Sequence, residues 1–305
     1  MTAGPYAITV VDPVALTDAM LIDCNVPETD YDAWDADTTY DQGDRVIVVS
    51  AHKVYESLVD GNTGNTPGAD VLNWQEVGAT NRWKPFDQSV SSQVKQADAI
   101  SYQLRPGRAA TALAALNLSG ATAMRARVVA PVTGDVYDRT IDLSAHPLES
   151  GWWAWYFGER RSPTQAILTD LPSYPTADLY IDFTGTADLG VGVILFGQAR
   201  RFSMGVKYGA RLGIQDYSRK ERNDFGDVMV VERNFAKRAS FTLQLGADEV
   251  DSLHRFLSSV RARACLWMGS TRYESTTVYG FYKSFDIVIS YFDYSDCDLE
   301  LEGLT

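Results

Sequence analysis

The clearest periodic pattern in the chain is an amphipathic stretch near its C-terminal end. Between residues 247 and 263, apolar side chains recur three and four positions apart, which places them on one face of a helix. Acidic residues occupy the first turn and arginines the last, an order that complements the helix dipole. The apolar stripe consists of Val250, Leu253, Phe256, Leu257 and Val260. The sequence therefore predicts one helix over residues 247–263.

Strand patterns flank this helix on both sides. Residues 239–245 alternate apolar and polar side chains, and residues 264–268 form a short apolar run. Further predicted strands cover residues 278–282, 285–291 and 297–301. One helix among many strands predicts a β-sandwich or barrel with a single packed helix over residues 205–305, with a generic α+β domain as the alternative.

The middle of the chain, residues 84–204, has the pattern of an antiparallel sandwich. Alternating apolar runs are separated by turn signals, and this spacing is typical of a jelly roll. The turn signals are Ser119-Gly120, residues 133–135, residues 172–175 and Thr184-Gly185. The sequence predicts that each of these positions separates two strands.

An aromatic run, WWAWYF, occupies residues 152–157 within this middle region. Exposed aromatic rings would offer a sugar-binding site. The interpretation we favour is a strand in which alternate rings fill the core, while the others face a neighbouring domain or subunit.

The N-terminal part divides into residues 1–30, with a predicted strand at 6–11 and a linker, and a small unit at 31–83. The small unit carries most of its bulk in four aromatic residues: Trp34, Tyr40, Tyr55 and Trp74. A unit of this size has little core, so some of these rings must be structural. We expect two of the four to hold the core and favour Tyr55 and Trp74 as the rings offered to a ligand, because polar residues follow each directly.

Charge is distributed unevenly along the chain. The whole chain has 27 basic and 40 acidic side chains, a net charge of −13. Residues 1–83 hold 14 acidic side chains against three basic ones, a net charge of −11. This acidity argues against nucleic-acid binding by the N-terminal part. The C-terminal arginines and lysines come without the interleaved aromatics of a nucleic-acid site. Salt bridges between subunits, or pairing with the acidic N-terminal unit, are the better interpretation.

The residues that usually carry catalysis or metal binding are sparse. Cys24, Cys265 and Cys297 are too few and too scattered for a disulfide framework or a zinc site, so we expect reduced thiols. The histidines are His52, His146 and His254, and none has a zinc-ligand partner at suitable spacing. No nucleophile elbow or phosphate-binding loop is present. We therefore expect no enzyme activity, no cofactor, no signal peptide and no transmembrane helix.

Several segments resemble parts of known proteins. The order Trp34, Tyr40, residues 43–46, Tyr55, Pro67 and Trp74 is similar to small chitin- and cellulose-binding modules, whose exposed aromatic rings stack on sugars. Residues 79–87 resemble a junction found in bacteriophage tail-tip proteins between such a module and a β-sandwich. The sandwich pattern resembles the galactose-binding-like jelly rolls of phage baseplates. The element order of 205–305 resembles the tail-tube fold.

These resemblances imply a mainly β structural protein of a tailed-phage tail tip or baseplate, of the distal tail type. Tyr55, Trp74, Trp34 and Tyr40 would be its carbohydrate-binding candidates. Its partners would be further copies of itself in a ring of six or three, the tail tube and hub proteins, and a host-surface glycan. It would be made in the host cytoplasm and reside in the virion tail, without sequence-specific nucleic-acid binding or membrane insertion. The alternative is a free carbohydrate-binding protein, or an accessory module of a polysaccharide-degrading enzyme.

Overall fold

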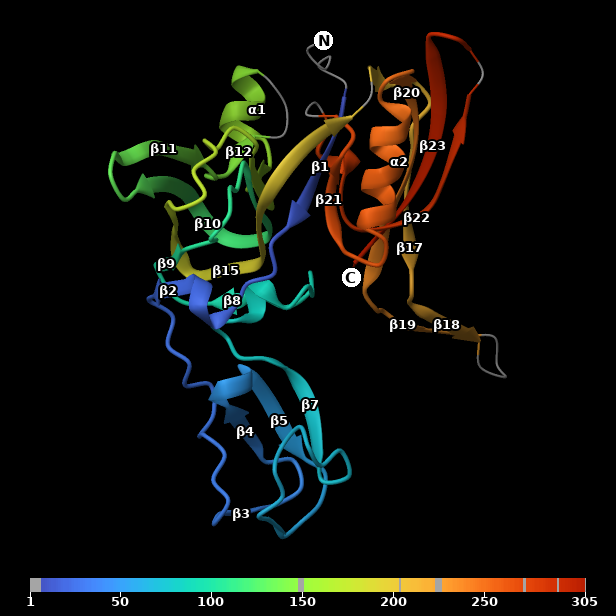
Figure 1. The fold of residues 1–305 in the computed structure, drawn as a ribbon. Coiled ribbons are helices and arrows are strands. Elements are labelled where there is room, and N and C mark those ends of the chain that lie inside the picture. The colour runs from blue at the N-terminus through green and yellow to red at the C-terminus, as the bar shows by residue number, and fades with distance from the viewer. Residues whose placement is uncertain are drawn as a thin grey trace. The chain divides into compact units, whose positions relative to one another are not determined.

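A computed structural model describes residues 7–147, 151–202, 204–222, 227–270, 273–289 and 291–304 (Figure 1). The described part of the chain is mainly β with antiparallel sheets, which confirms the predicted fold class. Two predicted strands reach beyond the described residues, at Tyr6 and at Ser290. No described helix is long and apolar enough to cross a membrane.

The chain forms two compact units that do not follow its linear order. Unit 1 comprises residues 1–14, 110–113 and 196–305, and unit 2 comprises residues 15–109 and 114–195. The predicted N-terminal segment, residues 1–30, is thus shared between the two units. Strand β15 (Asp178–Phe202) begins in unit 2 and ends in unit 1.

Unit 1 is an antiparallel sheet with one long helix. Strand β1 (Ile8–Pro13) lies between the end of β15 and β21 (Cys265–Met268). The sheet continues through β22 (Thr277–Val288), β23 (Tyr294–Gly303) and β20 (Phe235–Gly246). Strands β16 (Gly205–Val206) and β17 (Arg211–Asp216) both pair with β20 at the edge. The predicted strands 278–282 and 285–291 fall on one strand, β22, which has an irregularity between Tyr282 and Ser284 and ends at Val288.

Helix α2 (Val250–Ser259) covers the apolar face of this sheet. Leu253, Phe256 and Leu257 of the helix and Val260 directly after it are buried, as the periodicity predicts, while Val250 is partly buried. They share a core with Phe241, Leu243 and Trp267. The helix is shorter than the predicted 247–263. Residues 247–249 form a turn in which Glu249 accepts a hydrogen bond from the Gly246 amide at 3.1 Å. After the helix, Ala262 adopts a left-handed conformation with a φ of 58°, which ends the helical path.

A long two-stranded ribbon extends from the edge of the unit 1 sheet. Strand β17 pairs with β20 from Arg211–Ser240 to Asp216–Phe235, and the ribbon continues as β18 (Arg219–Arg222) paired with β19 (Val228–Val231). Hydrogen bonds from the Tyr217 amide to the Asn234 carbonyl and from the Arg233 amide to the Ser218 hydroxyl join the two parts.

Unit 2 is built around β10 (Ala112–Ala130) and the first part of β15, which are neighbours in its sheet. Strands β11 (Gly134–Asp142) and β14 (Gln165–Leu168) pair with β10. Strands β8 (Val94–Lys95) and β9 (Ala99–Leu104) pair with β15, and β2 (Leu21–Cys24) pairs with β9. Short 3-10 helices lie at Asp18–Met20, Val49–Ala51, Lys84–Phe86 and, in unit 1, Glu274–Thr276.

Two of the predicted turns are wrong. Ser119-Gly120 lies inside β10, and Thr184-Gly185 lies inside β15. A Cβ added to Gly185 would lie 2.4 Å from the Gly120 carbonyl oxygen. The glycines therefore permit a close approach of two continuous strands rather than ending them.

The predicted strand at residues 152–157 is also wrong, because these residues form the short helix α1 (Trp152–Phe157). It follows β12 (His146–Pro147), which pairs with β13 (Arg160–Arg161). None of its aromatic rings is buried. The expected alternation of core and surface rings is therefore absent.

Residues 31–83 form the small β module within unit 2. Strands β4 (Arg45–Val48), β5 (Lys53–Ser57) and β7 (Trp74–Ala79) make a three-stranded sheet, and β3 (Thr39–Tyr40) pairs with β6 (Asn62–Thr63). Five strands thus build the module, two of them in a short pair apart from the main sheet.

Candidate functional site

The four predicted carbohydrate-binding aromatics lie together, but mostly inside the module. Tyr40, Tyr55 and Trp74 are buried with Val46 in one core cluster, and Trp34 packs half-buried against it. The Tyr40 and Trp74 rings meet edge to face with centroids 5.3 Å apart. The indole nitrogen of Trp74 donates a hydrogen bond to the Asn65 carbonyl at 2.8 Å. These contacts are those of a small protein core.

The expectation that Tyr55 and Trp74 offer their rings to a ligand is therefore corrected. Their exposed fractions are 6% and 3%, so neither ring has a free face on which a sugar could stack. The Tyr55 hydroxyl also lies against Gly68, whose φ is 84° and whose added Cβ would be 2.9 Å from the oxygen. The sequence argument failed because polar neighbours such as Glu56 and Gln75 alternate with the buried side chains along a strand.

A joint between this module and the rest of unit 2 centres on Glu28, whose side chain is only 7% exposed. Its Oε1 accepts a hydrogen bond from the Thr80 hydroxyl at 2.8 Å and lies 2.9 Å from Nδ1 of His52. The His52 ring stacks on Trp83 with centroids 4.0 Å apart, and Arg82 donates to the Val26 carbonyl at 2.7 Å. Such a buried, partnered carboxylate fixes local geometry.

Aromatic contacts extend this joint through residues 79–87. Trp83 meets Phe86 at 6.3 Å between centroids, and Phe86 meets Tyr102 of β9 at 5.4 Å, so these rings pack the end of the module against unit 2. Arg82 lies 3.9 Å from the Glu28 carboxylate. Sequence reasoning missed His52 and Glu28, because their spacing of 24 residues matches no local motif.

Helix α1 carries a dense group of exposed aromatic side chains, which we call the α1 ridge. Its members are Trp152, Trp153, Trp155, Tyr156 and Phe157, and each is at least 59% exposed. Arg160 lies 6.0 Å above the Trp155 ring and donates to the Trp155 carbonyl at 3.4 Å. So many large exposed rings on one short helix mark an interaction surface.

The ribbon of unit 1 exposes a second apolar surface. The four residues of β19, Val228–Val231, are consecutive, apolar and 48–64% exposed, so both faces of the strand are apolar. Its partner β18 carries charged side chains only. At the junction between β17 and β18, hydrogen bonds from the Ser218 hydroxyl and amide, together with Lys220, lower the pKa of Asp216 to about 2.

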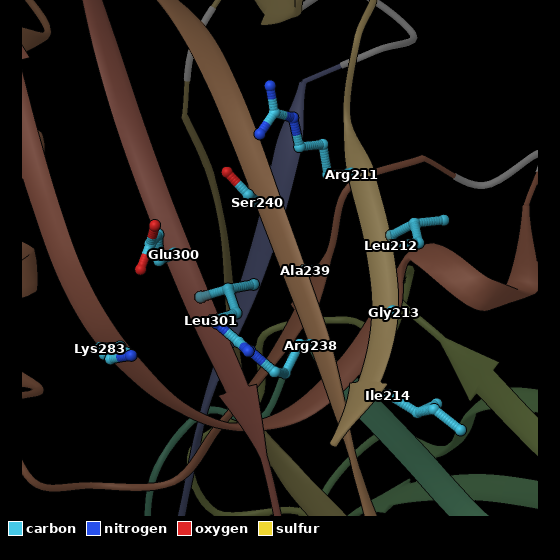
Figure 2. Close-up of a pocket in the computed structure, with 10 residues that line it drawn as sticks. All are labelled: Arg211, Leu212, Gly213, Ile214, Arg238, Ala239, Ser240, Lys283, Glu300 and Leu301. Carbon is cyan, nitrogen blue, oxygen red and sulfur yellow. The ribbon is translucent and has the colours of Figure 1, made fainter. Parts of the chain in front are cut away.

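A pocket of about 280 Å³ lies on the polar face of the unit 1 sheet (Figure 2). Arg211, Arg238 and Lys283 line it together with Glu300. In Figure 2, Leu212 and Ile214 point away from Glu300 and Lys283, which lie on the other side of β20. The pocket is smaller and more charged than a typical small-molecule site, so it resembles a polar contact surface more than a substrate cavity.

The described residues show no grouping typical of a metal or thiol site. No group of three or more histidine, cysteine, aspartate or glutamate side chains is placed to hold a metal ion in the described part of the chain. Burial raises the pKa of the Cys265 and Cys297 thiols to about 12, which makes both poor nucleophiles near neutral pH.

No protein-family model matches the sequence, and a search of curated proteins finds no match either.

Proposed function

We propose that this chain is a structural subunit of a tailed-phage tail tip or baseplate, a ring protein of the distal tail type. In this proposal, residues 205–305 build a closed ring from several copies, and the ring joins tail tube to baseplate. The resemblances in the sequence suggest the setting, and the exposed sheet edge of unit 1 supports the assembly.

The observation that carries the proposal is strand β19. A strand with apolar side chains on both faces is typical of the interior of a sheet, where both faces are covered. Among the described strands, β19 pairs only with β18, and its other edge has no partner. It also lacks the charges, prolines and bulges that usually protect a free edge. Contact with a second copy would cover both its faces and its edge.

Glycan binding by the small β module, the other role that the sequence resemblances imply, has less support. A glycan site in the module would need exposed rings, and three of its four aromatic candidates are core residues. Trp34 is the one candidate that is half-buried rather than buried. The module would therefore act as an appendage of the ring, with glycan contact limited to its outer residues.

A test of the assembly role compares particle mass between variants of the full chain. Met229→Lys with Val231→Lys places charge on β19, and Val71→Lys with Leu72→Lys makes the same change at two exposed residues of the module. Mass photometry should show a closed oligomer for the wild type and the module variant, and smaller species for the β19 variant. Equal masses for all three proteins would refute the role of β19.

The second candidate is a free carbohydrate-binding protein, which the small β module favours. This function requires no self-assembly, so the wild type would be a monomer that binds a glycan. Glycan-array binding by a monomer, lost on Trp34→Ala, would favour it over the ring.

A further inference from the structure

The α1 ridge has no role in the ring proposed above, because it belongs to unit 2. Its five rings form one continuous series. The closest pair is Trp153 and Phe157, with centroids 4.4 Å apart, and the other neighbouring pairs lie 5.3–5.9 Å apart. The series ends at the Arg160 guanidinium over Trp155. A connected aromatic surface of this kind acts as a unit in binding.

The area of the ridge can be compared with that of known interfaces. Aromatic side chains bury about 150–250 Å² each, so five rings that are 59–75% exposed present roughly 600 Å². This lies at the upper end of apolar patches on ordinary monomers, which measure about 300–600 Å². Two such ridges packed together would bury roughly 1,200 Å², the lower limit for a specific stable interface.

Ring geometry argues against a glycan as the occupant. Neighbouring ring planes in the ridge are inclined by 44–87°, so the rings do not form a flat platform for a sugar chain. The composition of tryptophan, tyrosine and phenylalanine followed by arginine is that of a protein interface.

We propose that the α1 ridge is a self-association surface, on which a second copy of this chain packs its own α1 ridge about a two-fold axis. An isologous contact needs a surface that is complementary to itself, and an apolar ridge meets this condition. Glu159, Arg160 and Arg161 follow the ridge after one glycine and present both signs of charge. A two-fold axis lets a carboxylate of one copy face a guanidinium of the other.

The first experiment measures self-association of the full chain by sedimentation velocity over a concentration series. Trp153→Ser with Phe157→Ser removes the closest ring pair, and Val71→Ser with Leu72→Ser is the matched control at two exposed apolar residues. The ridge variant should weaken the step that joins two copies at least about tenfold, because paired aromatics are interface hot spots. Unchanged association would overturn the proposal. If this variant fails to fold, Trp152→Ser, at a 75% exposed ring, replaces it.

The second experiment separates the two-fold contact from the ring. In a two-fold contact the same patch of both copies meets, so a residue close to the axis meets its own counterpart, whereas a ring contact joins two different patches. Oxidation of Trp152→Cys should therefore give a covalent dimer and no larger covalent species, while Val132→Cys, at a 97% exposed position, should not cross-link. The covalent Trp152→Cys dimer should also form when Met229→Lys and Val231→Lys prevent the ring. Equal cross-linking at both positions, or binding of the ridge to phosphatidylcholine vesicles as a monomer, would overturn the proposal.

Discussion

Replacing Trp74 by alanine tests whether the module aromatics form a core or a binding surface. The ring is 3% exposed and packs edge to face on Tyr40, and its indole nitrogen donates a hydrogen bond to the Asn65 carbonyl. Removing a buried tryptophan costs about 3–5 kcal/mol. A domain as small as residues 31–83 rarely derives more than about 3–5 kcal/mol from its core. We therefore expect Trp74→Ala to unfold the module rather than to remove a binding residue.

Hydrogen exchange read by mass spectrometry can follow this change segment by segment. Peptides from residues 31–83 should lose protection in Trp74→Ala, while peptides of β10, β15 and α2 keep theirs. The matched change is Leu72→Ala at an 80% exposed residue of the same module, which should alter protection nowhere by more than about 0.5 kcal/mol. A Trp74→Ala module that keeps its protection would refute the view that this ring is core.

Three further predictions concern the joint, the strand crossing and the thiols. Glu28→Ala removes the carboxylate that contacts His52 and the Thr80 hydroxyl, so thermal unfolding should show a loss of stability of about 1–3 kcal/mol. Glu76→Ala breaks an exposed pair with Lys53 and should cost only about 0–1 kcal/mol. Equal losses of stability in the two variants would contradict a structural joint. Gly185→Ala should destabilise the chain by about 1–3 kcal/mol in denaturant titrations, because its Cβ would meet the Gly120 carbonyl, whereas Gly213→Ala has open space and should be tolerated. Iodoacetamide at pH 8 should label Cys24 before the buried Cys265 and Cys297, and early labelling of Cys265 would contradict its burial. Burial raises the pKa of Cys265 and Cys297 to about 12, above the pKa of the same thiols in the unfolded chain. The free energy of unfolding should therefore fall as pH rises from about 9 towards 12.

The sequence predicts those parts of the fold that depend on local periodicity. The apolar stripe of α2 and the alternation of apolar and polar residues in β20 and β23 each predict that one face is buried. In the structure, the apolar side chains of these elements lie in one core. Helix ends were less predictable, because the left-handed Ala262 carries no signal in its residue type.

Other features depend on contacts between distant residues, and the sequence did not reveal them. Gly120 and Gly185 look like turn residues, but each is needed where two long strands approach closely. The run 152–157 has aromatic residues of high strand propensity, yet it forms a helix. In the module, a ring beside a polar residue looks the same in sequence whether it faces core or solvent, and this is why Tyr55 and Trp74 were misassigned as ligand rings.

Electron microscopy of the purified full-length protein tests the central claim most directly. A subunit of the proposed kind should appear as closed rings with a central opening, of six copies or else of three, and Met229→Lys with Val231→Lys should abolish them. Particles that remain monomeric at every concentration, with no ring among the class averages, would contradict the account.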